Sequence, residues 1–183
     1  MMSATALGAK FEKQVAEELQ RLGFEVWRDL YAPTPWGHSQ IDIVALKPGQ
    51  VWVVECKNWG GLLDVETWTV TQNNNRRKVG DFMAQNHTHC EVVSAALDVP
   101  CYSRVVVNDS LRFREGVPPV CCIPLKNLEY EVSTCKIQLP FTEATIMRAH
   151  RVFDSWSNVD AETKKQHRVR LQDKYNPPEV VPL

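Results

Sequence analysis

The alternation of apolar and polar positions predicts a helix near the start of the chain and another near its middle. Over residues 5–22, apolar residues recur at steps of three and four, the spacing of an amphipathic helix: Leu7, Phe11, Val15, Leu19 and Leu22. Thr5 is a suitable N-cap for this helix, and Gly23 is a suitable residue to end it. A second helical pattern covers residues 81–97.

Short apolar runs bounded by turn residues predict strands in the remaining parts of the chain. These runs are residues 24–27, 41–46, 51–57, 63–72, 102–108 and 117–123. Residues 31–39, with two prolines and a glycine, are expected to form a loop, as are the polar and basic residues 72–78. Two helices capped by Thr142 and Asp160 are expected next, and residues 176–178 should be extended and poorly ordered.

The strands at 41–46 and 51–57 carry charged residues where a buried strand should be apolar. If Pro48-Gly49 forms the turn between them, Lys47 pairs with Gln50. The same register opposes four polar residues in two pairs, Asp42 with Glu55 and Gln40 with Lys57. Because side chains alternate between the faces of a strand, all four project from one face. The other face is uniformly apolar: Ile41, Ile43, Ala45, Trp52, Val54 and Cys56. The sequence thus predicts a polar notch at one end of an apolar hairpin.

Two carboxylates opposed in this way would have Cβ atoms about 4.5–5.5 Å apart and would repel each other. A bound divalent cation removes that penalty, and hard oxygen ligands favour Mg²⁺ or Mn²⁺ over zinc. Lys57 is then within reach to stabilise the charge of a phosphate or to orient a water. The pattern therefore predicts metal-assisted hydrolysis of a phosphodiester. The alternative is a surface hairpin in which Glu55 and Lys57 form an ordinary ion pair.

Asp42 followed by Glu55-Cys56-Lys57 resembles the D…E-x-K signature of the restriction-endonuclease-like PD-(D/E)-x-K superfamily. The longer string from Gln40 to Gly61 is similar to the nuclease-related domain (NERD) family. The first helix of that family carries G-x-x-F/G-E, as Gly8-Ala9-Lys10-Phe11-Glu12 does here. Gln85 and His89 fit the family's later helix, although Asp81-Phe82 replaces its Asn-Pro. The resemblance covers roughly residues 7–125.

The resemblance implies an α/β fold with a restriction-endonuclease-like core, in which helices flank a central mixed β-sheet. We expect a nuclease-like domain at 1–140 and a helical C-terminal extension with a disordered end at 141–183. The implied activity is that of a Mg²⁺-dependent deoxyribonuclease, with Mn²⁺ as the other candidate cation.

The resemblance also assigns roles to residues. Asp42 and Glu55 would be metal ligands, with the backbone carbonyl of Cys56 as a third, and Lys57 the catalytic lysine. Glu12 would complete the site, and Gln85 would be an accessory polar residue near the phosphate. Periodicity alone does not choose between Glu12 and Glu18, which lie at opposite edges of the apolar stripe.

Composition restricts how such a protein would bind DNA and where it would act. The 183 residues carry a formal net charge of −1, so binding to DNA must rest on local patches, for which Arg76, Arg77 and Lys78 are candidates. No apolar run resembles a membrane span or a signal peptide, so no membrane association and a cytoplasmic location are expected. The six cysteines are expected to be reduced thiols. His87-Thr88-His89-Cys90 is interpreted as a polar helix face in preference to a zinc site.

Two alternative functions remain open at this point. A structure-selective nuclease of the Holliday-junction-resolvase type would use the same residues and would be favoured by a stable dimer. A non-catalytic DNA-binding or adaptor module could keep the fold without the reaction. Besides DNA, the partners considered are a second copy of the chain and a protein bound through the C-terminal helices.

Overall fold

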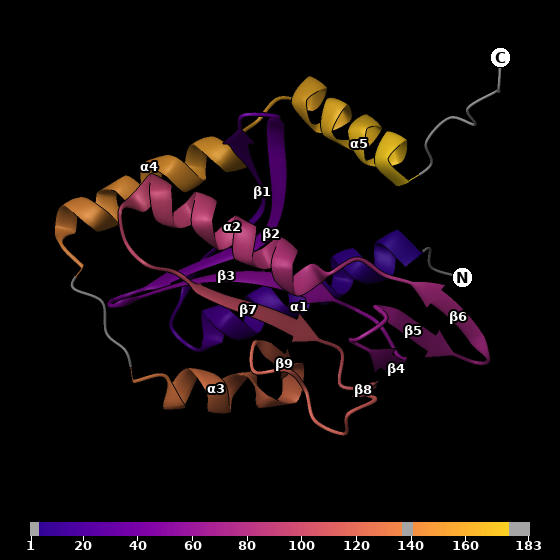
Figure 1. Cartoon of the computed structure of the whole chain (residues 1–183). Helices are drawn as coiled ribbons and strands as arrows, with labels where there is room; N and C mark the ends of the chain where they lie inside the picture. Colours follow the sequence, from indigo (N-terminus) through magenta and orange to yellow (C-terminus); the bar gives the residue numbers. More distant parts are fainter. Residues whose placement is uncertain (1–3, 137–140, 176–183) are drawn as a thin grey trace, which may run out of the picture.

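The computed structural model describes residues 4–136 and 141–175, in which helices surround a mixed β-sheet (Figure 1). Along the chain the elements are α1 (Ala4–Arg21), β1 (Glu25–Thr34), β2 (Gly37–Lys47), β3 (Gln50–Lys57), β4 (Gly61–Asp64), β5 (Thr69–Gln72), β6 (Asn75–Lys78), α2 (Phe82–Leu97), β7 (Tyr102–Val107), β8 (Leu111–Phe113), β9 (Cys122–Pro124), the 3₁₀ turn η1 (Leu125–Asn127), α3 (Leu128–Thr134), α4 (Glu143–Ser157) and α5 (Ala161–Tyr175).

The strands form two sheets. The main sheet has the order β1-β2-β3-β7-β9, antiparallel from β1 to β3 and parallel from β3 to β9. A smaller sheet of order β6-β5-β4-β8 lies beyond the carboxyl ends of β3 and β7 (Figure 1). This arrangement confirms the predicted α/β class with a central mixed sheet flanked by helices.

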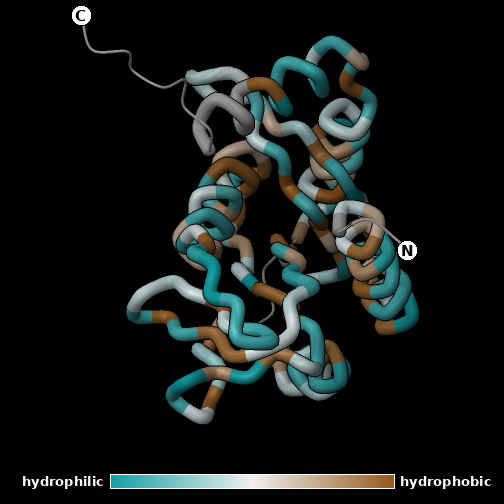
Figure 2. The backbone as a smooth tube through the Cα atoms, turned by 90° about the vertical axis from the view of Figure 1, so that its right-hand side faces the viewer, coloured by the Kyte–Doolittle hydropathy of each residue, from teal (hydrophilic) through white to brown (hydrophobic). Residues whose placement is uncertain are grey.

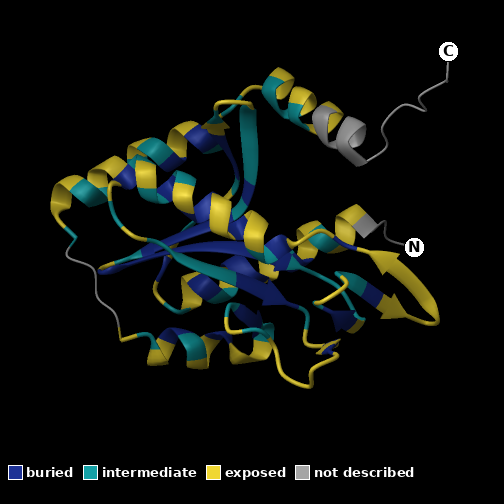
Figure 3. Cartoon of the chain, viewed as in Figure 1, coloured by how far each residue is buried: buried dark blue, intermediate teal, exposed yellow. Residues whose placement is uncertain are grey.

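Helices cover both faces of the main sheet. Phe11, Val15 and Leu19 of α1 and Leu128 of α3 pack on one face in a core that includes Trp52. The other face is covered by α2 and α4, whose contacts include Val93, Leu97, Ala149 and Phe153. The central strand β3 is almost completely buried between these layers, whereas the edge strand β1 is only partly buried (Figure 3). Hydrophobic and hydrophilic segments alternate along the covering helices, as expected for amphipathic helices (Figure 2).

The helix ends follow the capping chemistry of the sequence. After α1, Gly23 has a φ of 88° and donates its backbone N–H to the Gln20 carbonyl, 3.0 Å away. The predicted caps Thr142 and Asp160 accept hydrogen bonds from Thr145 N (3.1 Å) and Thr163 N (2.7 Å). In α2, Asp81 is the N-cap and accepts from Ala84 N at 2.9 Å, so the helix proper begins one residue later than expected.

The predicted loop at 31–39 is wrong, because most of it belongs to a long hairpin. β1 continues to Thr34 and β2 begins at Gly37, leaving only a tight turn between them. β1 is the edge strand of the main sheet, where a proline such as Pro33 removes no hydrogen bond from a neighbour. Prolines therefore marked an edge strand here, not an end of sheet structure.

Other local predictions also need correction. The strand expected at 63–72 is two strands, β4 and β5, because the Asp64 carboxylate accepts the N–H groups of Glu66 and Thr67 and so forms a turn. The expected loop at 72–78 is largely the strand β6, which pairs with β5. Of the strand expected at 117–123, only its last two residues are in β9. The helix α3 was not predicted.

The helix α4 is built into the core of the fold. Phe153 has no solvent exposure, and its ring lies 5.1 Å from that of Trp27 in β1. The indole N–H of Trp27 also donates to Asp154 at 2.9 Å. The domain boundary at residue 140 stays a prediction, and the stretch 176–178 lies outside the described residues. Within the part of the chain that is described, no helix has the length and apolar character needed to cross a bilayer.

Candidate active site

The β2–β3 hairpin has the register that the sequence predicts near its turn. Lys47 pairs with Gln50, and the ladder continues regularly to the pair of Ile43 with Val54. Gly49 supplies the turn with a φ of 81°. The candidate site begins where this ladder ends, at the far end of the hairpin from the turn.

Asp42 and Glu55 are neighbours, but they are not the paired opposite residues that we expected. The ladder stops at Ile43–Val54, and the Asp42 carboxylate accepts the Cys56 backbone N–H at 2.9 Å. A side-chain oxygen of β2 thus accepts a hydrogen bond from β3 that a backbone carbonyl of β2 would accept in a regular ladder. Along its other edge β3 pairs with β7 from Trp52 to Lys57, so Glu55 keeps a partner there, Val105. The predicted pairing of Gln40 with Lys57 is likewise absent from the ladder.

The same interruption is present on the other side of β2. Asp29 of β1 has a φ of 53°, and regular pairing is broken there, between Arg28–Ile43 and Leu30–Ile41. Ile41 consequently joins the core cluster under α2 and α4, whereas Ile43 joins the one under α1. The prediction that Ile41 and Ile43 share a face is therefore wrong. The irregularity isolates Asp42 between two regular ladders.

Glu55 and Lys57 form a buried ion pair, not the exposed one of the alternative interpretation. The Lys57 ammonium donates to Glu55 Oε1, and the two side chains are 19% and 3% exposed for Lys57 and Glu55 respectively. Glu55 Oε2 is buried and has no hydrogen-bond partner in the described structure. A buried carboxylate oxygen without a partner is costly and indicates a position where a missing group would bind.

His89 of α2 borders the same carboxylate. Its Nδ1 lies 3.7 Å from Glu55 Oε2, and its Nε2 lies 3.0 Å from the Ser39 hydroxyl. Burial, the charge of Lys57 and His167 lower the pKa of His89 to about 4. The ring is therefore neutral near pH 7, and its approach to Glu55 is not a salt bridge at that pH. His89 had matched the family pattern, but its contact with Glu55 could not be read from the sequence.

Asp42 and Glu55 share a pocket of about 490 Å³ with residues of β2, α2 and α5. Burial and the negative charge of Glu55 raise the pKa of Asp42 to about 7, although Lys57 and the Cys56 N–H act in the opposite direction. For Lys57, burial works against the charged form, but Glu55 and Asp42 outweigh it and raise the pKa. Lys57 thus stays protonated beside two carboxyl groups, whose negative charge it does not fully compensate.

The environment of Glu12 separates it from Glu18. Burial is the largest cause that raises the pKa of Glu12, followed by the charges of Asp42 and Asp29. The half-buried Glu12 is thus within the electrostatic influence of Asp42, although it does not line the pocket that Asp42 and Glu55 share. Glu18 instead accepts hydrogen bonds from Arg21, the shorter at 2.7 Å. The geometry favours Glu12, the residue chosen by the family resemblance, although its role stays a prediction.

Gln85 lies on the rim of the site. It is exposed in the first turn of α2 and lines the pocket of Asp42 and Glu55. His89 follows it by four residues and therefore shares its helix face. Cys56 contributes its backbone N–H to the site, whereas its thiol is buried, which raises the thiol pKa well above its usual value. The proposed ligand role of the Cys56 carbonyl stays a prediction.

The three basic residues of β6 do not face the same way. Arg77 lies over the Trp59 ring, with its guanidinium carbon 5.1 Å from the ring centroid, and borders Lys57 in a small hollow that Lys78 also lines. Arg76 instead contacts the hydroxyls of Thr69 and Thr67, at 3.3 and 3.4 Å. Of the predicted DNA contacts, only Arg77 and Lys78 are therefore next to the site.

The helix α5 adds a residue that the sequence did not reveal. His167 lines the pocket of Asp42 and Glu55, and its Nδ1 lies 3.0 Å from the His38 carbonyl oxygen. Lys164, one turn earlier, forms a 3.2 Å ion pair with Asp29. Because these contacts join residues more than 120 positions apart, no local pattern could have predicted them.

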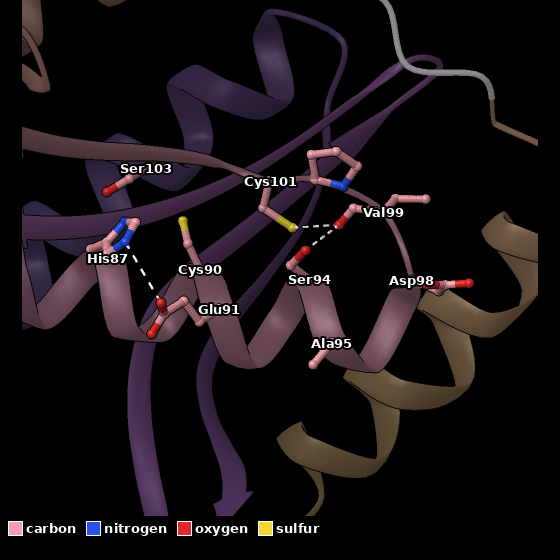
Figure 4. Close-up of a pocket in the computed structure, with 10 residues that line it drawn as sticks. His87, Cys90, Glu91, Ser94, Ala95, Asp98, Val99, Cys101 and Ser103 are labelled. Carbon is pink, nitrogen blue, oxygen red and sulfur yellow. Dashed lines mark hydrogen bonds and ion pairs between the residues drawn. The ribbon is translucent and has the colours of Figure 1, made fainter.

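The side chains of the segment His87 to Cys90 do not converge on one point. His87 is exposed and lies 3.7 Å from Glu91, whereas His89 is turned toward Glu55. Cys90 packs in the core and borders a separate pocket with Cys101 (Figure 4). Among residues 4–136 and 141–175, no three His, Cys, Asp or Glu side chains are grouped to hold a metal.

Comparison with known proteins identifies the family of the chain. The model of the nuclease-related domain matches residues 7–108, which include Glu12, Asp42, Glu55, Lys57 and Gln85. No curated protein matches the chain. Among solved structures, a crystallised protein of unknown function, AF1548, is similar over 92% of this chain and 96% of its own, with 14% identity and a TM-score of 0.40, and that likeness carries no argument. Because the family model covers more than half of the chain, the protein belongs to the nuclease-related domain (NERD) family.

Proposed function

We propose that this protein is a divalent-cation-dependent nuclease that hydrolyses the phosphodiester bonds of DNA. The observation that carries the proposal is the buried Glu55 with the half-buried Asp42 next to it and Lys57 beside them, one Glu55 oxygen lacking a hydrogen-bond partner in the described structure. Membership of the nuclease-related domain family supports a nuclease-related function for the same residues.

The donor set fits magnesium or manganese. Magnesium is usually held by one or two carboxylates, and water and substrate phosphates complete its shell. Asp42 and Glu55 supply two carboxylates, and no third acidic, histidine or cysteine side chain of the described residues joins them as a closed metal cage. Closed sites of four nitrogen and sulfur ligands are typical of structural zinc, so this site does not fit structural zinc. When bound, the cation would lower the pKa of a water and offset the charge of a phosphate.

The residues of the chain then have distinct tasks. Asp42 is held in place by the Cys56 N–H, and Glu55 by Lys57, so both carboxylates are oriented before any ligand binds. Lys57 keeps its proton, since its pKa is raised, and stabilises the negative charge that develops on the phosphate. The neutral His89 ring lies against Glu55 Oε2 and shields that side of the carboxylate from solvent. Gln85 can donate its amide to a phosphate oxygen from the rim.

The proposal is tested by cation binding and cleavage in the same preparation. Mn²⁺ binding, followed by electron paramagnetic resonance, should be strong in the wild type and lost in Asp42→Asn. Plasmid DNA should be cut with Mg²⁺ or Mn²⁺ and left intact with a chelator. His87→Ala, a change on the exposed face of α2, is the control and should retain both properties. Binding of DNA with no cleavage under any cation would instead favour the adaptor alternative.

A further inference from the structure

A second pocket, of about 920 Å³, opens on the other side of Lys57. Its wall is formed by the start of α1, the residues after β3, and the β5–β6 hairpin, and includes Trp59, Gln72 and Asn108. The volume lies within the range of roughly 300–1,000 Å³ that is typical of small-molecule sites. Asp42 and Glu55 do not line this pocket, so it is distinct from the proposed catalytic pocket.

The two pockets are connected through a small hollow of about 270 Å³. The hollow shares Lys57, Trp59 and Arg77 with the second pocket, and it shares Gly80 and Gln85 with the catalytic pocket. The shared walls mark a path from the carboxylates, past Lys57, to Trp59 that a DNA strand could follow. A strand with its phosphate beside Lys57 would place an adjacent nucleotide along that path.

Trp59 offers an aromatic surface in this path. The ring is half-buried and is fixed by the edge of Phe82, at a centroid distance of 5.4 Å. Arg77 and the Lys57 ammonium lie over the ring, 5.1 and 5.6 Å from its centroid, so a base that stacks on Trp59 takes the place of one of these cations. Nucleobases stack on aromatic side chains, and nearby cations bind the phosphates that follow them. The combination is suited to a base and its phosphate together.

Amide groups line the rest of the pocket. Asn108 donates to Asn58 at 2.7 Å, and Asn58 donates to the Leu7 carbonyl at 2.9 Å, so this wall is rigid. The Gln72 side chain is exposed and forms no hydrogen bond with the described residues, so its amide is free to meet a polar ligand edge. A Cβ at Gly60 would lie 3.1 Å from both Gln72 Nε2 and Ser110 Oγ, so the glycine keeps the pocket at its present width.

We propose that this pocket binds an unpaired nucleobase of the DNA strand whose phosphate lies beside Lys57. The substrate is then single-stranded DNA, or a duplex from which one base is turned out of the stack. Trp59 stacks on the base, the Gln72 amide forms hydrogen bonds with the polar edge of the base, and Arg77 binds the neighbouring phosphate. This inference rests on the proposed nuclease function, which places the phosphate at Lys57.

The test measures base contact without cleavage, in the Asp42→Asn background, because Asp42 is outside the pocket. A short single strand with 2-aminopurine at successive positions reports stacking by loss of its fluorescence, and replacing that base with an abasic residue reports what the base contributes. One position should be quenched, and the abasic strand should bind about tenfold or more weakly, since stacking of a base on an aromatic ring is worth about that much. Trp59→Leu should abolish both effects.

Matched variants separate base contact from folding. Trp68 also packs against Phe82, with a centroid distance of 5.2 Å, but lines none of the connected pockets, so Trp68→Leu should retain the quenching. Gln72→Ala changes an exposed side chain and should weaken binding of the intact strand several-fold, but not binding of the abasic strand. A lower melting temperature of Trp59→Leu than of Trp68→Leu would reveal that the Trp59 variant folds less stably. In that case the result is decided by the other two variants, Gln72→Ala and Gly60→Ala, in which a loss of binding by the intact strand alone supports the pocket.

The outcomes distinguish the pocket from the proposed function. Tighter binding of a single strand, or of a duplex with one mismatch, than of a fully paired duplex supports the pocket. Equal binding of intact and abasic strands, unchanged by Trp59→Leu and Gln72→Ala, overturns it even if the wild type cuts plasmid DNA. Position-specific quenching by a protein that cuts no DNA with any cation would support the pocket and overturn the nuclease function.

Discussion

At the scale of single residues, the site is defined by a deficit of positive charge. Glu55 is buried with the half-buried Asp42 next to it, the charge of Asp42 acts on Glu12, and Lys57 forms an ion pair with Glu55. A buried acid is stable only when it is paired, hydrogen-bonded or neutral. Burial, and after it the charge of a neighbouring acid, raises the pKa values of Asp42 and Glu12, and a divalent cation would offset the excess negative charge.

The first prediction concerns the helix acid. Glu12→Gln should lower the cleavage rate about 10- to 100-fold, the usual cost of removing a supporting group from a metal site. Glu18→Gln, on the same helix but engaged with Arg21, should leave the rate unchanged. Initial rates on plasmid DNA at saturating Mg²⁺ measure both. Equal losses in the two variants would show that Glu12 has no special position.

The second prediction follows from the raised pKa of Asp42. In the absence of a cation Asp42 holds its proton until about pH 7, so cation binding and cleavage at low Mg²⁺ should rise as the pH increases through that value. Higher Mg²⁺ should shift the midpoint to lower pH, because the cation competes with the proton. Rates measured from pH 5.5 to 8.5 at two Mg²⁺ concentrations give the midpoints. Identical midpoints at both concentrations would contradict the assignment.

The same pKa predicts a stability effect in the cation-free protein. An acid whose pKa is higher in the folded state than in the unfolded state binds more protons when folded, so it destabilises the fold as the pH rises. Asp42→Asn should therefore raise the melting temperature at pH 8, and the gain should shrink as the pH falls toward about 4, the ordinary value for aspartate. Thermal unfolding at pH 4.5 and pH 8 in chelator tests this, and a gain that grows at low pH would contradict it.

Asp42, Glu55 and Lys57 could be singled out from the sequence as candidates, but their geometry could not be predicted. Acids at 42 and 55 in apolar strands, and a lysine at 57, are visible as violations of the strand pattern. Regular alternation, however, assumes an unbroken ladder. The left-handed backbone of Asp29 and the Asp42–Cys56 hydrogen bond break it, and neither leaves a mark in the pattern of apolar residues.

At the scale of elements, the β5–β6 hairpin gives the basic segment a direction. Successive residues of a strand point to opposite faces, and the side chains of Arg76 and Arg77 contact different parts of the structure. Arg77 lies over Trp59 next to Lys57, whereas Arg76 borders a pocket with Asp64 and Arg114. If residues 72–78 formed the loop expected from the sequence, no such difference between Arg76 and Arg77 could be predicted.

The fourth prediction uses that alternation. Arg77→Ala should weaken DNA binding and reduce the slope of log affinity against log salt by roughly 1, as expected for one lost phosphate contact. Arg76→Ala removes the same charge from the adjacent position and should leave the slope unchanged. Fluorescence anisotropy of a labelled oligonucleotide across a salt series gives both slopes. Equal effects would mean that only net charge matters.

Elements with strong local signals were predicted well, and elements fixed by distant contacts were not. The helices capped by Thr142 and Asp160 carry their caps in the sequence, and both caps are present. The long β1–β2 hairpin was obscured by prolines that an edge strand tolerates. The contribution of α5 to the pocket depends on Lys164 and His167 meeting β1 and β2, which only the folded chain reveals.

At the scale of the whole molecule, the part of the chain beyond the family match belongs to the same fold. The match ends at residue 108, yet Ala149, Phe153 and Trp156 of α4 complete the core over β1 and β2. Those strands carry Asp29 and Asp42, so the packing of α4 stabilises the strands that form the site. We therefore expect the described part of the chain to unfold as one cooperative unit.

The fifth prediction tests whether the described part of the chain unfolds as one cooperative unit. Phe153→Ala should lower the free energy of unfolding by about 3–5 kcal/mol, the usual cost of removing a buried phenyl ring. Met147→Ala, at a position of α4 with 58% exposure, should change it by less than about 0.5 kcal/mol. Urea unfolding followed by Trp fluorescence and by far-ultraviolet circular dichroism should give one coincident transition for each. Two separate transitions would show that the C-terminal helices form an independent unit.

The central claim is that Asp42, Glu55 and Lys57 form a hydrolytic centre that depends on a divalent cation. The most direct test is the rate of DNA cleavage by the wild type and by Lys57→Ala, with Mn²⁺ binding measured in the same samples. We predict that Lys57→Ala retains Mn²⁺, because both carboxylates remain, but cuts DNA about 10²- to 10³-fold more slowly, the usual cost of losing one charge-stabilising donor. Equal cleavage by the two proteins, or none by the wild type with any divalent cation, would contradict the claim.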